Sequence, residues 1–176
     1  SGNKFSDEGT VYSVEIWDPA TGEWSVMDSM DIPRNYHSIA LLQADGTVFA
    51  AGGGLTGGGP ADHPDAQVFS PDYLFDSDGS LADRPEITTV GNASYGQTIS
   101  VQVTDGQPIE RFNLIRMSTV THSVNTDQRL IPVEFSSNGN DEYSLVMPGT
   151  GAIAPPGYSM LYPLNSDGTP RGAAVI

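Results

Sequence analysis

The feature that most constrains the fold is a long succession of short, strand-like runs separated by turn residues. The runs are rich in β-branched and aromatic side chains, as β-strands are. The chain contains 20 glycines and 13 prolines, many of them between these runs, and no stretch shows the apolar period of an amphipathic helix. Such a chain has to bury its apolar side chains between sheets, so the sequence predicts an all-β protein.

The first third of the chain is predicted to form two β-hairpins. The first turns at residues 18–22, where proline fixes φ early and glycine allows a positive φ late. The second turns at Asp45-Gly46, a pair typical of a type I′ turn. This order is the layout of one blade of a kelch-type β-propeller, and residues 68–75 are expected to begin another blade. The strands expected here are residues 11–17, 23–27, 38–42 and 47–51.

After Arg84-Pro85 the spacing of strands and turns changes to that of a β-sandwich. We therefore predict two domains: residues 1–82 as the C-terminal blades of a kelch-type propeller, and residues 83–176 as an immunoglobulin-like sandwich. The strands expected in the second domain are residues 86–90, 97–103, 111–116, 130–135, 143–146 and 158–164.

Charge and composition exclude several classes of function. A formal net charge of −15, from 22 acidic and seven basic residues, repels nucleic acid and anionic membranes, so neither is an expected partner. No apolar run is long enough to span a bilayer. The absence of cysteine excludes a disulfide framework and any cysteine-ligated zinc or iron–sulfur site. The chain opens at Ser1-Gly2 without a methionine, so we expect a fragment, a processed product or an engineered piece.

Two histidine-containing segments are the candidates for chemistry, Arg-Asn-Tyr-His-Ser at residues 34–38 and Thr-His-Ser-Val-Asn at residues 121–125. Imidazole is the commonest transition-metal ligand, and a phenolate oxygen can join it. Tyr36 and His37 are neighbours that would point to opposite faces of a regular strand, so both reach one metal only if the backbone is irregular there. From spacing alone, hydrogen-bonded structural histidines are the more common explanation, and a copper or zinc site is the alternative. His63 is expected to anchor a loop.

Longer runs of the sequence resemble the family of galactose oxidase and the other mononuclear copper-radical oxidases. The run of nine residues that begins at Thr121 is the most specific of them, and the match extends over nearly the whole chain. The resemblance implies a seven-bladed kelch propeller followed by an immunoglobulin-like sandwich of the early set (E-set) type, with this chain holding the last blade or blades and the sandwich. The matching segments are Arg-Asn-Tyr-His-Ser at 34–38, Gly-Gly-Gly-Leu at 52–55, Asp-Ala-Gln-Val-Phe at 65–69, Thr-His-Ser-Val-Asn-Thr-Asp-Gln-Arg at 121–129 and Pro-Gly-Tyr at 156–158.

Carried over position by position, the resemblance implies one copper ion bound by the imidazoles of His37 and His122. Tyr36 would be the axial ligand and would accept the proton of the substrate hydroxyl. A free phenol ionises only near pH 10, whereas a metal-bound phenol can exist as phenolate at neutral pH. By ungapped spacing to Tyr36, Phe5 lies where the family has an aromatic residue that lines the substrate pocket. The tyrosine–cysteine radical cofactor of the family cannot form in a chain without cysteine.

The resemblance therefore implies a copper site completed by residues outside this chain, in an N-terminal propeller segment or a companion chain. The implied activity is oxidation of a primary alcohol, such as a galactose-like sugar, to an aldehyde, with reduction of dioxygen to hydrogen peroxide. Two alternatives stay open. One is an aldehyde oxidase similar to the glyoxal oxidases, and the other is a non-catalytic module that binds carbohydrate or a protein partner. The family also implies an extracellular, secreted protein, and this chain alone is expected to be incomplete as an enzyme.

Overall fold

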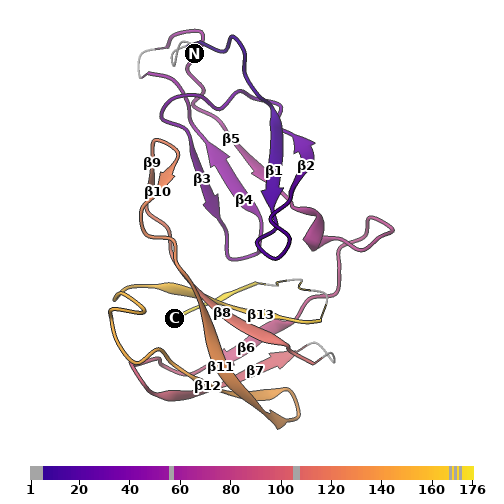
Figure 1. The fold of residues 1–176 in the computed structure, drawn as a ribbon, viewed down its shortest axis with the longest axis vertical. Coiled ribbons are helices and arrows are strands. Elements are labelled where there is room, and N and C mark those ends of the chain that lie inside the picture. Colours follow the sequence, from indigo (N-terminus) through magenta and orange to yellow (C-terminus); the bar gives the residue numbers. More distant parts are fainter. Residues whose placement is uncertain (1–5, 56–57, 105–107, 167, 169, 171) are drawn as a thin grey trace. The chain divides into compact units, whose positions relative to one another are not determined.

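The computed structural model describes residues 6–55, 58–104, 108–166, 168, 170 and 172–176 (Figure 1). Within these ranges the regular secondary structure consists of β-strands and one 3-10 helix, η1 (Asp72–Leu74), so the all-β prediction is confirmed. No helix in the described part of the chain is long and apolar enough to cross a membrane. The chain divides into two compact units. Unit 1 comprises Ser1–Gln43, Thr47–Asp72 and Val120–Asn125, and unit 2 comprises Ala44–Gly46, Tyr73–Thr119 and Thr126–Ile176.

The first part of the sequence forms two separate antiparallel sheets in unit 1. The hairpin of β1 (Ser13–Trp17) and β2 (Trp24–Ser29) is one sheet, and its turn lies within the predicted Asp-Pro-Ala-Thr-Gly segment. The other sheet has the order β3-β4-β5, from β3 (Ile39–Leu42), β4 (Val48–Ala51) and β5 (Ala66–Phe69). The two predicted hairpins therefore exist, but no described ladder joins them into one four-stranded blade.

Two details of the predicted blade are wrong. Residues 68–75 do not begin a new blade, because Ala66–Phe69 pairs with the free edge of β4 and is followed by η1. The Asp45-Gly46 turn is not type I′, because that turn needs two successive residues with positive φ and only Gly46 has one (86°). Instead, Gln43 N donates to Thr47 O at 2.8 Å across a three-residue loop that ends in the left-handed glycine.

A short hairpin from the second half of the sequence also belongs to unit 1. Its strands are β9 (Val120–Thr121) and β10 (Val124–Asn125), with His122 and Ser123 in the turn. The backbone N–H of Ser123 donates to the carbonyl oxygen of Ser38, one residue before β3, at 2.9 Å. The hairpin is thereby attached to the segment that carries the first histidine motif.

Unit 2 is a seven-stranded antiparallel sheet that folds back on itself. Its long strand β11 pairs through residues 130–133 with β8 and through residues 134–139 with β12, so β11 belongs to both halves of the sheet (Figure 1). Every strand predicted for this part of the chain is present. In spatial order the strands are β14 (Ala174–Val175), β13 (Ser159–Leu164), β8 (Arg111–Arg116), β11 (Leu130–Gly139), β12 (Glu142–Val146), β7 (Thr98–Thr104) and β6 (Glu86–Val90).

The core of unit 2 lies between the two halves of this sheet. Along β7, buried and exposed side chains alternate, as expected for a strand with one face in the core. Val101 and Leu145 come from one half and Phe112 and Leu161 from the other, and each is at most 1% exposed. A core with contributions from both halves makes this part of the chain a β-sandwich in which β11 continues from one layer into the other.

Two buried tyrosines are expected to make the stability of unit 2 fall at alkaline pH. Burial raises the pKa of Tyr162, with further contributions from Tyr73 and Asp45. Burial and Asp45 likewise raise the pKa of Tyr73, whose hydroxyl donates to Gly46 O at 2.6 Å. Above about pH 10 the unfolded chain releases these protons while the folded chain keeps them. The stabilisation is therefore complete below that pH and is lost as the pH rises above it.

Urea unfolding between pH 8 and 11.5, followed by the methyl NMR signals of Leu161, checks this expectation. The free energy of unfolding should decrease steadily above pH 10, and the Tyr162→Phe variant should show a shallower decrease. The control is Tyr158→Phe, which removes the hydroxyl of a side chain that is 73% exposed. Equal slopes for Tyr162→Phe and the wild type would contradict the assignment to Tyr162.

Candidate metal centre

Three aromatic rings that sequence analysis selected lie together in unit 1. Tyr36 and His37 lie just before Ser38 and β3, and His122 lies at the turn between β9 and β10. The ring centroids are 3.9 Å apart for Tyr36 and His37, 4.4 Å for the two histidines, and 5.2 Å for Tyr36 and His122. The structure thus brings together every predicted metal ligand of the chain. The fourth predicted site residue, Phe5, lies outside the described residues.

The backbone at both histidines is irregular, which is the condition stated from the sequence for Tyr36 and His37 to reach one metal. His37 has φ 72°, His122 has φ 53° and Ser123 has φ 62°, all in the left-handed region. In an extended strand, Tyr36 and His37 would point to opposite faces. The left-handed backbone at His37 instead places both rings on one side. This conformation costs roughly 1–2 kcal/mol for a residue other than glycine. Backbone strain of this kind is typical of functional sites.

The glycine-rich segment at residues 52–55 fixes the orientation of His37. Its Nδ1 lies 2.8 Å from the carbonyl oxygen of Gly54. A carbonyl oxygen can only accept, so Nδ1 carries the hydrogen, and in the neutral ring the lone pair is on Nε2. Gly54 N also donates to Tyr36 O at 2.6 Å, so one residue holds two members of the cluster. Metal-binding histidines commonly donate their second N–H to a carbonyl in this way.

The second histidine is positioned by its own hairpin and by a pair of serines. Nδ1 of His122 is 2.7 Å from Oγ1 of Thr121, while its ring is exposed. Ser38 follows His37 and Ser123 follows His122, and their hydroxyl oxygens are 3.3 Å apart. Together with the bond from Ser123 N to Ser38 O, this contact ties the two histidine-bearing segments to each other. Sequence analysis did not identify Gly54 or the serines as positioning residues, and the only available signal was that each serine follows a histidine.

His63 has a different role, and the prediction that it anchors a loop is confirmed. Its Nε2 lies 3.0 and 3.1 Å from the two carboxylate oxygens of Asp7, and its backbone N–H donates to Gly53 O at 3.0 Å. Asp7 also accepts from Nδ2 of Asn35 at 3.0 Å. His63 therefore joins the N-terminal segment to the glycine-rich segment.

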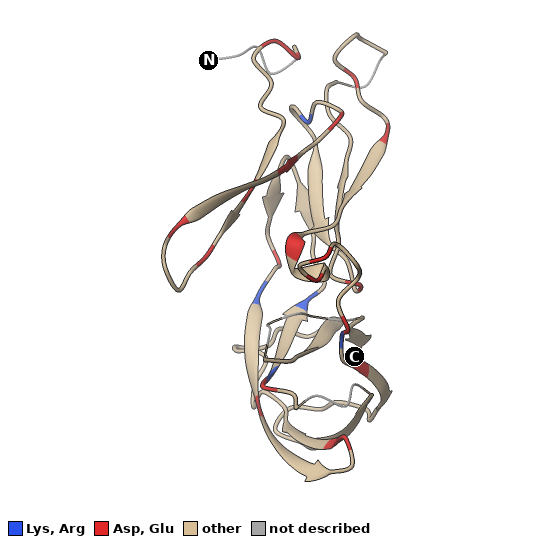
Figure 2. Ribbon diagram, turned by 90° about the vertical axis from the view of Figure 1, so that its right-hand side faces the viewer, with Lys and Arg blue, Asp and Glu red and all other residues tan. Residues whose placement is uncertain are grey.

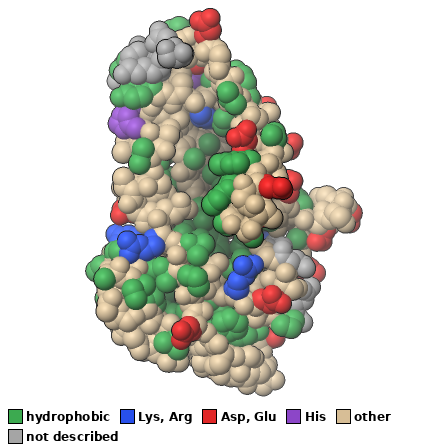
Figure 3. All heavy atoms as spheres, in the orientation of Figure 1, with side chains coloured by type: hydrophobic (Ala, Val, Ile, Leu, Met, Phe, Trp, Pro, Cys, Tyr) green, Lys and Arg blue, Asp and Glu red, His purple; other side chains and the backbone are tan. Residues whose placement is uncertain are grey.

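The chemistry of the donor set suits a transition-metal ion but does not fill its coordination sphere. Among the described residues, no cluster of three or more His, Cys, Asp or Glu side chains has the geometry of a metal site. The cluster in unit 1 instead offers two imidazoles and one phenol, a nitrogen and oxygen set that fits Cu(II) or Zn(II). Figure 2 shows the acidic residues scattered along the ribbon. Figure 3 shows a histidine side chain at the surface of the face in view. Because His122 is exposed, an ion at the cluster would be accessible from outside this chain.

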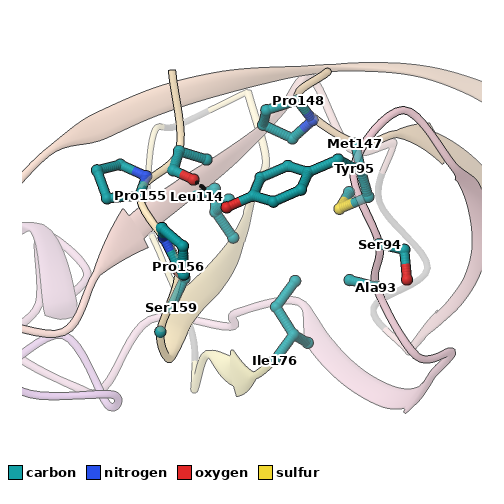
Figure 4. Close-up of a pocket in the computed structure, with 12 residues that line it drawn as sticks. Ala93, Ser94, Tyr95, Leu114, Met147, Pro148, Pro155, Pro156, Ser159 and Ile176 are labelled. Atoms are coloured by element: carbon teal, nitrogen blue, oxygen red, sulfur yellow. Dashed lines mark hydrogen bonds between the residues drawn. The ribbon is translucent and has the colours of Figure 1, made fainter. Parts of the chain in front are cut away.

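A cavity in unit 2 lacks this chemistry. It measures about 330 Å³, and the ring of Tyr95 stands in it beside Pro148, Pro155 and Pro156 (Figure 4). The Tyr95 hydroxyl donates to Ala154 O at 2.8 Å. Among its described lining residues, only Tyr95 has a titratable side chain, so we place the candidate chemistry in unit 1.

Comparison with known families decides where the chain belongs. Residues 84–176 match the family model described as "Galactose oxidase-like, Early set domain". The chain belongs to this galactose oxidase-like family. The matched range includes His122 and its hairpin, whereas Tyr36 and His37 precede it, so the ring cluster joins residues of the E-set sequence to residues outside it.

Relatives of this galactose oxidase-like chain include oxidases that are named for different substrates. A galactose oxidase from Gibberella zeae is 42% identical over 175 residues, which cover 99% of this chain and 26% of that protein. An aldehyde oxidase from Arabidopsis thaliana is 33% identical over 150 residues, 74% of this chain and 24% of that protein. The chain thus spans about a quarter of the length of these curated relatives.

A solved structure agrees with the sequence relatives. It is that of a fungal alcohol oxidase of the AA5 family in complex with copper, with a TM-score of 0.91 and 39% identity. The match covers 98% of this galactose oxidase-like chain and 37% of that chain. The family resemblance stated from the sequence is confirmed.

Proposed function

We propose that this chain supplies part of the copper site of a copper-radical oxidase. That enzyme oxidises a primary alcohol, such as a galactose-like sugar, to an aldehyde and reduces dioxygen to hydrogen peroxide. The observation that carries the proposal is the convergence of Tyr36, His37 and His122, with strained backbone at both histidines. His37 and His122 would bind the ion through their imidazoles, and Tyr36 would bind it through its phenol oxygen. Phe5 would line the substrate pocket.

The rest of the site is proposed to come from residues outside this chain. Two imidazoles and one phenol leave a copper ion short of ligands, and the curated relatives are about four times longer. An N-terminal propeller segment or a companion chain would supply the remainder, including a radical cofactor that a chain without cysteine cannot form. We assign residues 1–82 to the C-terminal blades of a seven-bladed kelch propeller and residues 83–176 to the immunoglobulin-like domain. The likeness to the fungal alcohol oxidase over nearly the whole chain supports this assignment, and the family supports an extracellular location.

Each residue of the cluster has a defined task in this mechanism. Bound copper would supply one-electron redox chemistry and would polarise the oxygen atoms bound to it. Tyr36, as a phenolate, accepts the proton of the alcohol hydroxyl. The Gly54 carbonyl keeps the hydrogen of His37 on Nδ1, which leaves Nε2 for the metal. The bonds between Ser38 and Ser123 hold the two imidazoles at their separation.

A second candidate is the oxidation of a small aldehyde. It is favoured by the 33% identity to the plant aldehyde oxidase. A hydrated aldehyde presents a hydroxyl group, from which Tyr36 could accept a proton in the same manner. The cluster in this chain serves both reactions, because the groups that would distinguish the substrates lie elsewhere in the proposed site.

Copper titration of the purified chain, followed by an oxidase assay, tests the proposal. We expect binding of about one Cu(II) per chain with two nitrogen ligands in the electron paramagnetic resonance spectrum. Peroxide should form only when a companion polypeptide with the remaining propeller blades is added. Galactose and glyoxal, assayed in parallel, separate the two candidate substrate classes. A chain that takes up no Cu(II), or binds it without imidazole nitrogen, would leave only a non-catalytic module that binds carbohydrate or a partner.

A further inference from the structure

One sequence motif outside the ring cluster marks a candidate modification site in unit 2. Asn92, Ala93 and Ser94 form a sequon, the acceptor sequence of N-linked glycosylation. No other asparagine of the sequence is followed two positions later by serine or threonine. Because so short a motif also occurs by chance, its accessibility in the folded chain decides whether it can be modified.

The sequon lies in the connection between β6 and β7, which hydrogen bonds hold on both sides of it. Before the sequon, Gly91 N donates to Ser100 O at 3.3 Å. After it, Gly96 N donates to Pro148 O at 3.0 Å. Between these bonds, the backbone N–H and C=O groups of the first two sequon residues have no hydrogen-bond partner among the described residues. The acceptor segment is therefore positioned by its flanks but takes no part in a sheet.

The side chains of the sequon are exposed and are not engaged elsewhere. All three residues are exposed, and neither the Asn92 amide nor the Ser94 hydroxyl has a hydrogen-bond partner within the described part of the chain. Ala93 and Ser94 line the cavity of Figure 4, so open space lies beside them. A turn follows directly, in which Gln97 N donates to Ser94 O at 3.1 Å and Gly96 has φ 68°. Both groups that a transferase has to reach are therefore accessible.

We propose that Asn92 carries an N-linked oligosaccharide. In this reaction, Asn92 Nδ2 forms a bond to the anomeric carbon of the first sugar of a lipid-linked oligosaccharide diphosphate. The bond from that carbon to the diphosphate oxygen breaks, and the lipid diphosphate leaves with the electron pair. Nδ2 loses one proton to a base of the transferase. The Ser94 hydroxyl, two positions later, is the group by which the transferase recognises the acceptor.

The proposal rests on the extracellular location proposed above, because this transfer takes place in the secretory pathway. The relatives support that condition, since they come from a fungus and a plant, and eukaryotes glycosylate secreted proteins in this way. The site uses neither copper nor the three aromatic rings. A bulky, solvated oligosaccharide would shield the exposed connection between β6 and β7, where Tyr95 is 49% exposed.

Peptide mapping by mass spectrometry of the protein purified from its source tests the site. A glutamate-specific protease releases residues 87–110, in which Asn92 is the only asparagine. We expect this peptide at masses raised by whole sugar units. Treatment with a peptide N-glycosidase in heavy-oxygen water should then convert Asn92 to an aspartate that carries the label. A digest in which the peptide occurs only at its unmodified mass would overturn the proposal.

Matched variants, secreted by a yeast and mapped in the same way, assign the oligosaccharide to the sequon. Ala93→Pro keeps the asparagine and the serine but blocks the acceptor sequence, and should lose the oligosaccharide completely. Ser94→Thr keeps the hydroxyl and should retain the oligosaccharide. An oligosaccharide that persists in Ala93→Pro would contradict the assignment to Asn92.

The result is separable from the test of the copper site. A chain that carries the oligosaccharide but takes up no Cu(II) would refute the oxidase proposal and leave this inference standing. A chain that binds Cu(II) through imidazole but has an unmodified Asn92 would refute this inference alone.

Discussion

Replacing His37 by alanine is expected to lower the affinity of the chain for Cu(II) at least about 100-fold. Loss of a partner that only orients a ligand costs 10–100-fold, and loss of a ligand should cost no less. His37 is half-buried, and alanine would keep the same left-handed backbone, so the free energy of unfolding should change little. Competition with a chelator of known affinity measures the constant, and the number of nitrogen couplings should fall from two to one.

His63 provides the matched control for this experiment. It is also a histidine of unit 1, but its ring is bonded to Asp7 and lies outside the ring cluster. His63→Ala should leave copper affinity unchanged while loosening the N-terminal segment. Equal losses for His37→Ala and His63→Ala would mean that the imidazoles bind copper non-specifically, and would contradict the proposed centre.

The strands of unit 2 could be predicted because their signals are local. The strand at Arg111–Arg116 was predicted to the residue, and turn residues marked the ends of the others. The order of strands could not be predicted in the same way. The change of partner within β11 depends on tertiary packing, and nothing in residues 130–139 marks the point where pairing passes from β8 to β12.

The errors in unit 1 have the same origin. The segment at Ala66–Phe69 has the composition of a strand, but whether it opens a new sheet or completes an old one depends on the free edge of β4. The β9–β10 hairpin was missed as secondary structure because its strands are two residues long and their sequence has no alternating pattern. It was found only as a histidine motif.

The residues of the candidate site could be predicted from the sequence, but the groups that hold them in position could not. If Tyr36 and His37 share one metal, their adjacency requires irregular backbone, since a regular strand separates neighbouring side chains. The hydrogen bond from His37 to the Gly54 carbonyl depends on a distance that no motif encodes. Arg34 was part of the recognised motif, yet the sequence does not show that it pairs with Asp65.

Gly54→Ala is expected to disrupt the centre without removing any ligand. Gly54 has φ +91°, and a Cβ atom there would overlap the carbonyl oxygen of Ala61 and the carboxylate of Asp62. Because backbone atoms cannot move aside as a flexible side chain can, we expect unit 1 to lose about 3–5 kcal/mol of unfolding free energy. The displaced Gly54 carbonyl would no longer hold Nδ1 of His37, so copper affinity should fall together with stability.

Gly58→Ala separates the steric effect from the backbone effect. Gly58 also has positive φ (+79°), but a Cβ atom there has no neighbour within 4 Å. This variant should lose only the roughly 1–2 kcal/mol of left-handed strain and should bind copper normally. Urea unfolding followed by tryptophan fluorescence reports on unit 1 alone, because both tryptophans of the chain, Trp17 and Trp24, lie in β1 and β2. If the two variants lose the same stability and the same copper affinity, the close packing around Gly54 does not position His37. Another acceptor must then be able to replace the Gly54 carbonyl in orienting this imidazole.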